Sequence, residues 1–213
     1  MPDFSIESAL IGPICGVDEA GRGPCAGPLC VAAVILDRDN LPEGIGDSKK
    51  LTEKQRFALE PLIKQSALAW SVVEISPADI DRMNIFAATM SGMSRAVETL
   101  SLNAAHALID GNKCPPMSIP AHAIVKGDDK SLSIAAASIL AKTARDRIMI
   151  DMDIHYPVYG FKKHKGYQAA AHIEAIRLHG PSPIHRMSWA TVKNVLAPSY
   201  SPIRDGGDVT AKL

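Results

Sequence analysis

The segment ICGVDEAGRGPCAGPLCVAAVIL, residues 14–36, contains two β-rich apolar runs joined by a loop of glycine and proline. The first run covers residues 14–17 and the second covers residues 29–36, and apolar runs bounded by turn residues are typical of strands. Because few residues separate them, we expect the two strands to pair antiparallel. The first run leads directly into Asp18 and Glu19, so this segment also places two acidic side chains at a strand end.

Further strands and helices are expected along the rest of the chain. Apolar runs predict three more strands, at residues 70–75, 105–109 and 121–125. Capping residues and helical spacing predict four helices, at about residues 52–64, 77–100, 133–154 and 167–179. This order indicates an α/β fold, with a mixed central sheet flanked by helices and a C-terminal helical segment.

The length and composition fit one globular domain. The chain has 213 residues, of which 46% are hydrophobic and 22% are charged, and this balance excludes a disordered or fibrous protein. We expect residues 1–196 to form a single domain whose last part, from about residue 155, is helical. Residues 197–213 are rich in glycine and aspartate towards their end, and we expect a flexible tail there.

Membrane insertion and secretion find no support in the sequence. No apolar run approaches the roughly 20 residues that span a bilayer, and the N-terminus lacks the pattern of a secretory signal. The four cysteines form no Cys-x-x-Cys pair, which favours reduced structural thiols. We therefore expect a cytoplasmic protein without a membrane association.

The charges balance overall but are unevenly distributed. Lysine plus arginine and aspartate plus glutamate number 23 each, for a formal net charge of zero. Residues 1–159 carry 15 basic and 20 acidic side chains, whereas residues 160–213 carry 8 and 3. One interpretation is a solvated basic face near the C-terminus. The other is an anion-binding surface beside an acidic site that needs cations.

Carboxylates follow three of the predicted strands. Asp18 and Glu19 follow the first, Asp110 follows another, and Asp128 comes shortly after the last. Side chains at the ends of neighbouring strands meet at one edge of an α/β sheet, and convergent carboxylates need cations to offset their repulsion. Such oxygen ligands suit Mg²⁺ or Mn²⁺. Two of these ions about 3.5–4 Å apart would activate a water and stabilise the leaving oxygen of a phosphodiester, which is the chemistry of a nuclease.

The residues around the first carboxylates carry a geometric constraint. Consecutive residues on a regular strand point to opposite faces, so we expect the strand to end or kink at Glu19 if both Asp18 and Glu19 face one site. Gly21 and Gly23 permit such a bend, and Arg22 between them can bind a phosphate in bidentate fashion. An isolated aspartate is more often a turn residue or a helix cap, so the hypothesis depends on the whole set.

The run Asp18-Glu19-Ala20-Gly21-Arg22-Gly23-Pro24 resembles the signature of the ribonuclease HII family. Trp189 stands where members of that family often have phenylalanine. Further motifs of the family occur in the family's order up to about residue 192: Asp47-Ser48-Lys49-Lys50-Leu51, Asn84-Ile85 with Ala88-Thr89, Asp110-Gly111-Asn112, Lys126-Gly127-Asp128, Ala135-Ala136-Ala137-Ser138-Ile139-Leu140-Ala141-Lys142, Arg145-Asp146, His164-Lys165-Gly166-Tyr167 and His185-Arg186-Met187-Ser188.

The resemblance implies an RNase H-like fold and a metal-dependent endonuclease with two Mg²⁺ or Mn²⁺ ions per site. It implies hydrolysis of the RNA strand of RNA–DNA hybrids. It also implies cutting on the 5′ side of ribonucleotides embedded in duplex DNA, which leaves a 3′-hydroxyl and a 5′-phosphate. The expected partners are therefore RNA–DNA hybrids and ribonucleotide-containing duplex DNA, bound by a monomer through the C-terminal helical segment.

The resemblance also assigns roles to residues of this chain. The metal-binding catalytic carboxylates would be Asp18, Glu19, Asp110 and Asp128. In the family, the Gly-Arg-Gly loop reads the ribose 2′-hydroxyl, the group that separates RNA from DNA, and a tyrosine packs on the neighbouring sugar. The matching residues are Gly21, Arg22, Gly23 and Tyr167. Basic side chains are expected to contact phosphates without selecting sequence, and these are Lys49, Lys50, Lys165 and Arg186.

Two other classes of protein stay open at this point. One is another two-metal phosphoryl-transfer enzyme such as ribonuclease HIII, for which an additional N-terminal domain is expected, and only 13 residues precede Ile14 here. The other is a non-catalytic module that binds hybrids. Four retained carboxylates argue against the second class, because a pure binder gains by losing negative charge near phosphates.

Overall fold

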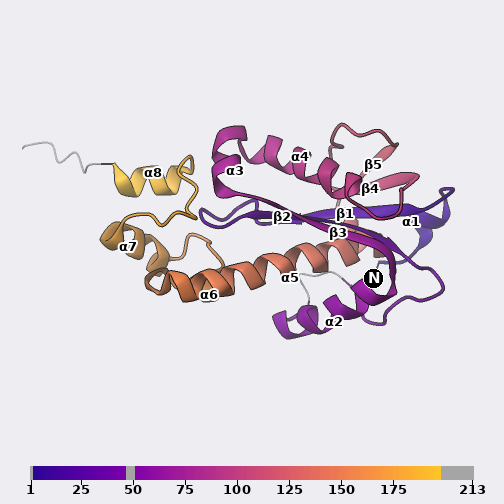
Figure 1. Ribbon diagram of the computed structural model, residues 1–213, viewed down its shortest axis with the longest axis horizontal. Coiled ribbons are helices and arrows are strands. Elements are labelled where there is room, and N and C mark those ends of the chain that lie inside the picture. The colour runs from indigo at the N-terminus through magenta and orange to yellow at the C-terminus, as the bar shows by residue number, and fades with distance from the viewer. Residues whose placement is uncertain (1, 47–50, 198–213) are drawn as a thin grey trace, which may run out of the picture.

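The computed structural model describes residues 2–46 and 51–197 of the chain. At its centre is a five-stranded sheet with the order β3-β2-β1-β4-β5 (Figure 1). β1, β2 and β3 pair antiparallel whereas β1, β4 and β5 pair parallel, which confirms the predicted mixed sheet. The strands are β1 (Ile14–Ala20), β2 (Leu29–Leu36), β3 (Ala67–Ile75), β4 (His106–Asp110) and β5 (Ala121–Ile124).

Helices cover both faces of the sheet. The long helix α5 packs on one face with α2 beside it, and α4 packs on the other face (Figure 1). Within the described ranges, no helix combines the length and the apolar character that crossing a bilayer requires. The helices and helical turns are α1 (Ser5–Ser8), α2 (Glu53–Ser66), α3 (Pro77–Met83), α4 (Ile85–Glu98), η1 (Gly127–Asp129), α5 (Leu132–His155), η2 (Pro157–Tyr159), α6 (Phe161–His164), α7 (Ala170–His179) and α8 (Ala190–Leu196).

Strand β1 has two neighbours over only part of its length. Its parallel pairing with β4 ends where Val17 lies opposite Ile109. Its antiparallel pairing with β2 continues until Ala20 lies opposite Cys30. The side of β1 that faces β4 is therefore unpaired beyond Val17. This unpaired edge coincides with the acidic end of the strand.

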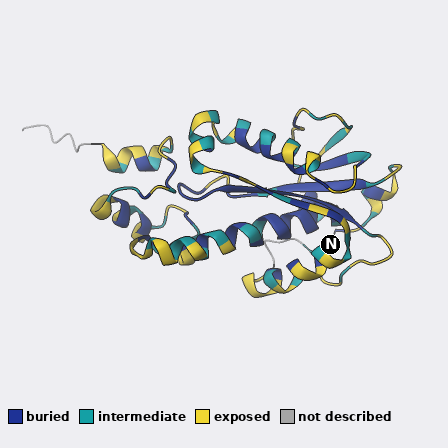
Figure 2. Cartoon of the chain, viewed as in Figure 1, coloured by how far each residue is buried: buried dark blue, intermediate teal, exposed yellow. Residues whose placement is uncertain are grey.

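Helix α5 approaches β1 closely at Gly16. A Cβ atom at Gly16 would lie 2.1 Å from the backbone carbonyl carbon of Ser133 and 2.2 Å from the backbone nitrogen of Ile134. The next residues of α5, 135–137, are all alanines and are fully buried against the sheet (Figure 2). Because small residues line this contact, the first turns of α5 lie directly on the strand, in the close packing of a protein interior.

One predicted helix is in fact two helices. The continuous helix expected over residues 77–100 is wrong, because α3 ends at Met83 and α4 begins at Ile85. Asn84 between them has a φ of 69°, and its side-chain oxygen accepts hydrogen bonds from two backbone N–H groups in the first turn of α4. The asparagine therefore acts as an N-cap at a sharp bend, which helical spacing alone does not reveal.

Two other helix boundaries differ from expectation in opposite ways. The capping box of Thr52 and Gln55 is confirmed at the start of α2, which runs slightly further than expected, to Ser66. The helix expected from residue 167 begins only at Ala170, because Gly166 has a φ of 81° and the chain turns before the helix starts. Tyr167 consequently lies in the loop that precedes α7 and not in a helix.

Gly16→Ala is expected to destabilise the fold, because the added methyl group meets the α5 backbone rather than a side chain that can move aside. We expect the free energy of unfolding to fall by at least about 3 kcal/mol. Gly46→Ala is the matched control, since a Cβ atom at Gly46 meets nothing closer than 4.0 Å. Urea unfolding followed by circular dichroism measures both variants, and equal losses would contradict the proposed contact.

Candidate active site

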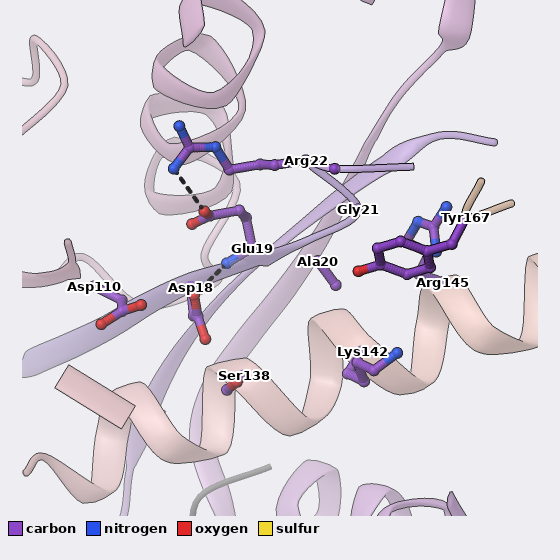
Figure 3. A pocket seen from close by; sticks show the side chains of 11 residues that line it. Asp18, Glu19, Ala20, Gly21, Arg22, Asp110, Ser138, Lys142, Arg145 and Tyr167 are labelled. Carbon is purple, nitrogen blue, oxygen red and sulfur yellow. Dashed lines mark hydrogen bonds and ion pairs between the residues drawn. The ribbon is translucent and has the colours of Figure 1, made fainter. Parts of the chain in front are cut away.

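A cavity of about 290 Å³ opens at the unpaired edge of β1 (Figure 3). Residues from β1, from the loop that follows it, from the end of β4 and from the middle of α5 line this cavity, together with one tyrosine from the C-terminal part of the chain. The lining residues are Asp18, Glu19, Ala20, Gly21, Arg22, Gly23, Asp110, Ser138, Lys142, Arg145 and Tyr167.

Asp18 and Glu19 point to opposite faces of β1. The kink expected at Glu19 is wrong, because the strand continues through Ala20. Asp18 is buried and points towards Ser138 on α5, whereas Glu19 points towards Arg22, whose Nη1 lies 3.3 Å from Glu19 Oε1 (Figure 3). Both carboxylates still line the cavity, since β4 does not cover this end of the strand. The unpaired edge thus replaces the bend that the sequence suggested.

Asp110 enters the same cavity from the end of β4. Its Oδ1 accepts a hydrogen bond of 2.6 Å from the backbone N–H of Gly127, which ties β4 to the helical turn η1. Asp128 is the next residue of that turn; it is buried and does not itself line the cavity. The structure therefore brings three of the four predicted carboxylates into one cavity and places the fourth in a turn bound to the third.

Three carboxylates share the cavity, and of the cations that line it Arg22 pairs with Glu19 while the two on α5 are bound to other groups. Burial, followed by the charges of Glu19 and Asp110, raises the pKa of Asp18 well above its ordinary value. Burial also raises the pKa of Glu19, although the nearby Arg22 opposes the shift and Asp110 adds to it. Among the described residues, no three acidic, histidine or cysteine side chains are gathered closely enough to hold a metal ion ready-made.

The donor set nevertheless fits a divalent cation. Glu19 Oε2 is buried and has no hydrogen-bond partner among the residues that the structure describes. A buried carboxylate oxygen without a partner is costly, and a cation supplies the missing partner. Asp18, Glu19 and Asp110 offer only hard oxygen ligands, which Mg²⁺ and Mn²⁺ prefer. Such an ion would also offset the repulsion that raises the pKa values of Asp18 and Glu19.

Three cavity residues on α5 were not expected to belong to the site. Ser138, Lys142 and Arg145 recur at helical spacing and form one polar stripe on an otherwise largely apolar, alanine-rich stretch of helix (Figure 3). Lys142 Nζ lies 2.9 Å from Asp146 Oδ1, and Arg145 donates to the backbone carbonyls of residues 26 and 28. A polar stripe on a buried helix was the available sequence signal for these residues.

Arg186 lies outside the cavity. The expected phosphate contact is wrong for this residue, because Arg186 is fully buried and is not among the residues that line the cavity. Its guanidinium donates instead to four backbone carbonyls of residues 21–28. Burial lowers the pKa of Arg186 below its ordinary value, and the nearby Arg145 adds to this effect. The side chain supports the loop behind the cavity.

The other expected substrate residues differ in accessibility. Tyr167 lines the cavity with 47% of its surface exposed, and its Cε1 would lie 3.5 Å from a Cβ atom at Gly23. The ammonium group of Lys165 donates to the carbonyl of Lys162 at 2.6 Å and pairs with Glu53 at 3.2 Å. Lys49 and Lys50 lie outside the described residues.

Comparison with known proteins agrees with this architecture. The family model described as Ribonuclease HII matches residues 15–192. The ribonuclease HII of Dechloromonas aromatica is 54% identical over 197 residues, which cover 92% of this chain and 99% of that protein.

Solved structures of related proteins share the fold. The ribonuclease H2 from Pyrococcus horikoshii OT3 aligns with a TM-score of 0.74 at 27% identity, over 86% of this chain and 97% of that one. A structure of the PCNA:RNase HII complex from Archaeoglobus fulgidus aligns with a TM-score of 0.74 at 28% identity, over 88% and 98%. The predicted RNase H-like fold is thereby confirmed. The chain belongs to the ribonuclease HII family, and it is a type 2 ribonuclease H of the kind that hydrolyses the RNA strand of RNA–DNA hybrids with divalent metal ions.

Proposed function

We propose that this enzyme cuts on the 5′ side of ribonucleotides embedded in duplex DNA, as well as within RNA–DNA hybrids, by a two-metal mechanism that leaves a 3′-hydroxyl and a 5′-phosphate. One observation carries the proposal: the carboxylates of Asp18, Glu19 and Asp110 share a single cavity with the loop Gly21-Arg22-Gly23. Groups suited to metal ions and a loop suited to a sugar therefore lie side by side. A single bound nucleotide can contact both.

We assign the metal ligands to Asp18, Glu19, Asp110 and Asp128. Two divalent ions, Mg²⁺ or Mn²⁺, would supply an activated water and stabilise the leaving oxygen. Asp18 and Asp110 hold negative charge on the α5 side and at the end of β4, while Glu19 holds it on the opposite face of β1. Arg22 pairs with Glu19 at 3.3 Å and keeps that carboxylate oriented towards the cavity mouth.

The choice of ribose over deoxyribose is assigned to the loop and Tyr167. The 2′-hydroxyl donates and accepts hydrogen bonds, so backbone groups can recognise it. Gly23 lies next to the exposed ring of Tyr167, since a Cβ atom at Gly23 would be 3.5 Å from Tyr167 Cε1, so a sugar held by the loop would lie beside that ring. We further propose that residues 1–196 act as one monomeric catalytic domain in the cytoplasm, that residues from about 155 contribute to substrate binding, and that Lys165 and the lysines at positions 49 and 50 contact phosphates.

Incubation with a DNA duplex that carries one ribonucleotide is expected to give a single cut, on the 5′ side of that nucleotide and only in Mg²⁺ or Mn²⁺. An all-DNA duplex of the same sequence and a reaction with EDTA are the controls. Denaturing electrophoresis, with end-group analysis by phosphatase and ligase, locates the cut and its chemistry. Cutting in EDTA, or equal cutting of the all-DNA duplex, would refute the proposal.

Asp18→Asn is expected to abolish cutting while hybrid binding survives, and Asp128→Asn should do the same. A carboxylate whose folded-state pKa is raised costs stability once the pH exceeds its unfolded value of about 4. Without metal at pH 7, Asp18→Asn should therefore be more stable than the wild type, with its unfolding midpoint at a higher urea concentration.

Asp151→Asn is the matched control for these variants, because Asp151 lies on the exposed part of α5 outside the cavity. It should leave turnover and stability unchanged, with the free energy of unfolding altered by less than about 0.5 kcal/mol. Wild-type turnover by Asp18→Asn or by Asp128→Asn would remove that residue from the metal site. A loss of stability in Asp18→Asn would contradict the repulsion argument.

Tyr167→Ala is expected to weaken cutting at a single embedded ribonucleotide more than cutting of a long hybrid, because the packing of the ring on a sugar is lost. Tyr167→Phe keeps the ring and serves as the matched control. The measured ratio is kcat/KM for the single embedded ribonucleotide divided by kcat/KM for the long hybrid. We expect this ratio to fall about tenfold in the alanine variant and less than about twofold in the phenylalanine variant. An unchanged ratio in Tyr167→Ala would contradict the packing role.

A further inference from the structure

Arg186 binds the loop Gly21-Arg22-Gly23 from behind. Its Nη2 donates to the carbonyl of Gly21 at 2.6 Å, and its Nη1 donates to the carbonyl of Arg22 at 3.2 Å. The same guanidinium continues along the chain, with bonds to the carbonyls of Gly27 at 3.0 Å and Pro28 at 3.2 Å. Arg186 is fully buried, whereas the loop lines the cavity. The loop therefore separates Arg186 from the position of a bound nucleotide.

Because the peptide bond is planar, these contacts also fix the direction of the N–H groups on the other side of the loop. In a trans peptide the C=O group of one residue and the N–H group of the next point in opposite directions. The carbonyls of Gly21 and Arg22 point at Arg186, so the N–H groups of Arg22 and Gly23 point away from it. Within the described residues, neither of these N–H groups has an acceptor at hydrogen-bonding distance.

The third carbonyl of the loop is held by other residues of the same C-terminal part. Gly23 O accepts from Trp189 Nε1 at 3.3 Å and from Gln168 Nε2 at 3.1 Å. The Trp189 ring also lies 4.9 Å from the guanidinium carbon of Arg186, at a distance typical of a cation–π contact. Every carbonyl of the loop is thus bound by a side chain from the C-terminal part of the chain.

Asp81 at the end of α3 anchors the segment that carries Arg186 and Trp189. Its Oδ2 accepts from the backbone N–H of Met187 at 2.7 Å, and its Oδ1 accepts from the N–H and the hydroxyl of Ser188 at 3.0 and 2.5 Å. The backbone N–H of Arg186 in turn donates to the carbonyl of Cys25 at 2.8 Å. Helix α3, the C-terminal segment and the residues after the loop therefore form one connected support.

We propose that Arg186 is a positioning residue for substrate selection: it binds the carbonyls of the Gly-Arg-Gly loop so that the N–H groups of Arg22 and Gly23 face the ribose. This proposal rests on the proposed function of the loop in reading the 2′-hydroxyl. The role depends on the shape of the side chain as well as its charge. A guanidinium donates in several fixed directions, whereas a lysine ammonium is a compact charge that cannot span four carbonyls.

Arg186→Lys tests the proposal in the Asp18→Asn background, where cutting is not expected to interfere with binding. Fluorescence anisotropy in Mg²⁺ measures the affinity for a duplex with one ribonucleotide and for the all-DNA duplex of the same sequence. The preference is the affinity for the ribonucleotide duplex divided by the affinity for the all-DNA duplex. We expect this ratio to fall at least about tenfold in Arg186→Lys, while the affinity for the all-DNA duplex stays within about twofold of the parent's. Arg95→Lys is the matched control, because Arg95 is an exposed arginine in the last turn of α4, outside the C-terminal segment.

Trp189→Phe is the second variant and decides the matter if Arg186→Lys does not fold. It removes the indole donor to Gly23 but keeps an aromatic ring beneath Arg186. Since Gln168 still binds the same carbonyl, we expect a smaller fall in the ratio, about two- to threefold. Thermal melting confirms that each variant is folded at the assay temperature.

The outcomes separate the two proposals. A parent protein without preference for the ribonucleotide duplex would refute the proposed function of the loop. A parent that has the preference, together with a folded Arg186→Lys variant that keeps it in full, would overturn the positioning role alone. Equal losses of affinity for both duplexes would also overturn it, because they indicate general weakening of duplex binding. An unchanged ratio in Trp189→Phe overturns it where Arg186→Lys is unfolded.

Discussion

The close contact between Gly16 and the first turns of α5 is the constraint on which the site depends. Backbone lies against backbone there, since a Cβ atom at Gly16 would come within 2.1 Å of the helix. With the start of α5 held in this way, the helix direction is set, and its later turns bring Ser138, Lys142 and Arg145 beneath the acidic end of β1. Arg145 then reaches the carbonyls of Ala26 and Pro28. A strand-to-helix contact without side chains thus aligns both walls of the cavity.

The open edge of β1 provides the second element of the site. A carboxylate pair on consecutive strand residues normally serves two separate faces of a sheet. Here the pairing with β4 stops at Val17, so carboxylates from both faces could reach one ion placed beside the strand end. The same geometry buries the two carboxylates beside Asp110, and burial raises the pKa values of both, with the charge of Asp110 adding to each shift. Holding this charge without metal costs stability, and a divalent cation at the proposed site would relieve that cost.

Much of this arrangement was predictable from the sequence because its determinants are local. Apolar runs located the five strands, and the carboxylates stand near or shortly after the ends of three of them. The bend at Asn84 escaped prediction because helical spacing continues across it, and only the φ of 69° reveals the break.

The role of Arg186 escaped prediction for a different reason. An arginine in a basic, histidine-rich segment resembles a phosphate ligand, and nothing nearby in the sequence indicates that its partners are carbonyls far upstream, such as Gly21 at a separation of 165 residues. That separation also has a consequence for synthesis. The carboxylates of β1 emerge from the ribosome early, yet the support behind the loop arrives only with the last part of the chain. Contacts so distant in sequence are slow to form. On the proposed assignment, a nascent chain would carry its metal-binding acids long before the loop that reads ribose is supported, and selectivity would be the last property that the growing enzyme acquires.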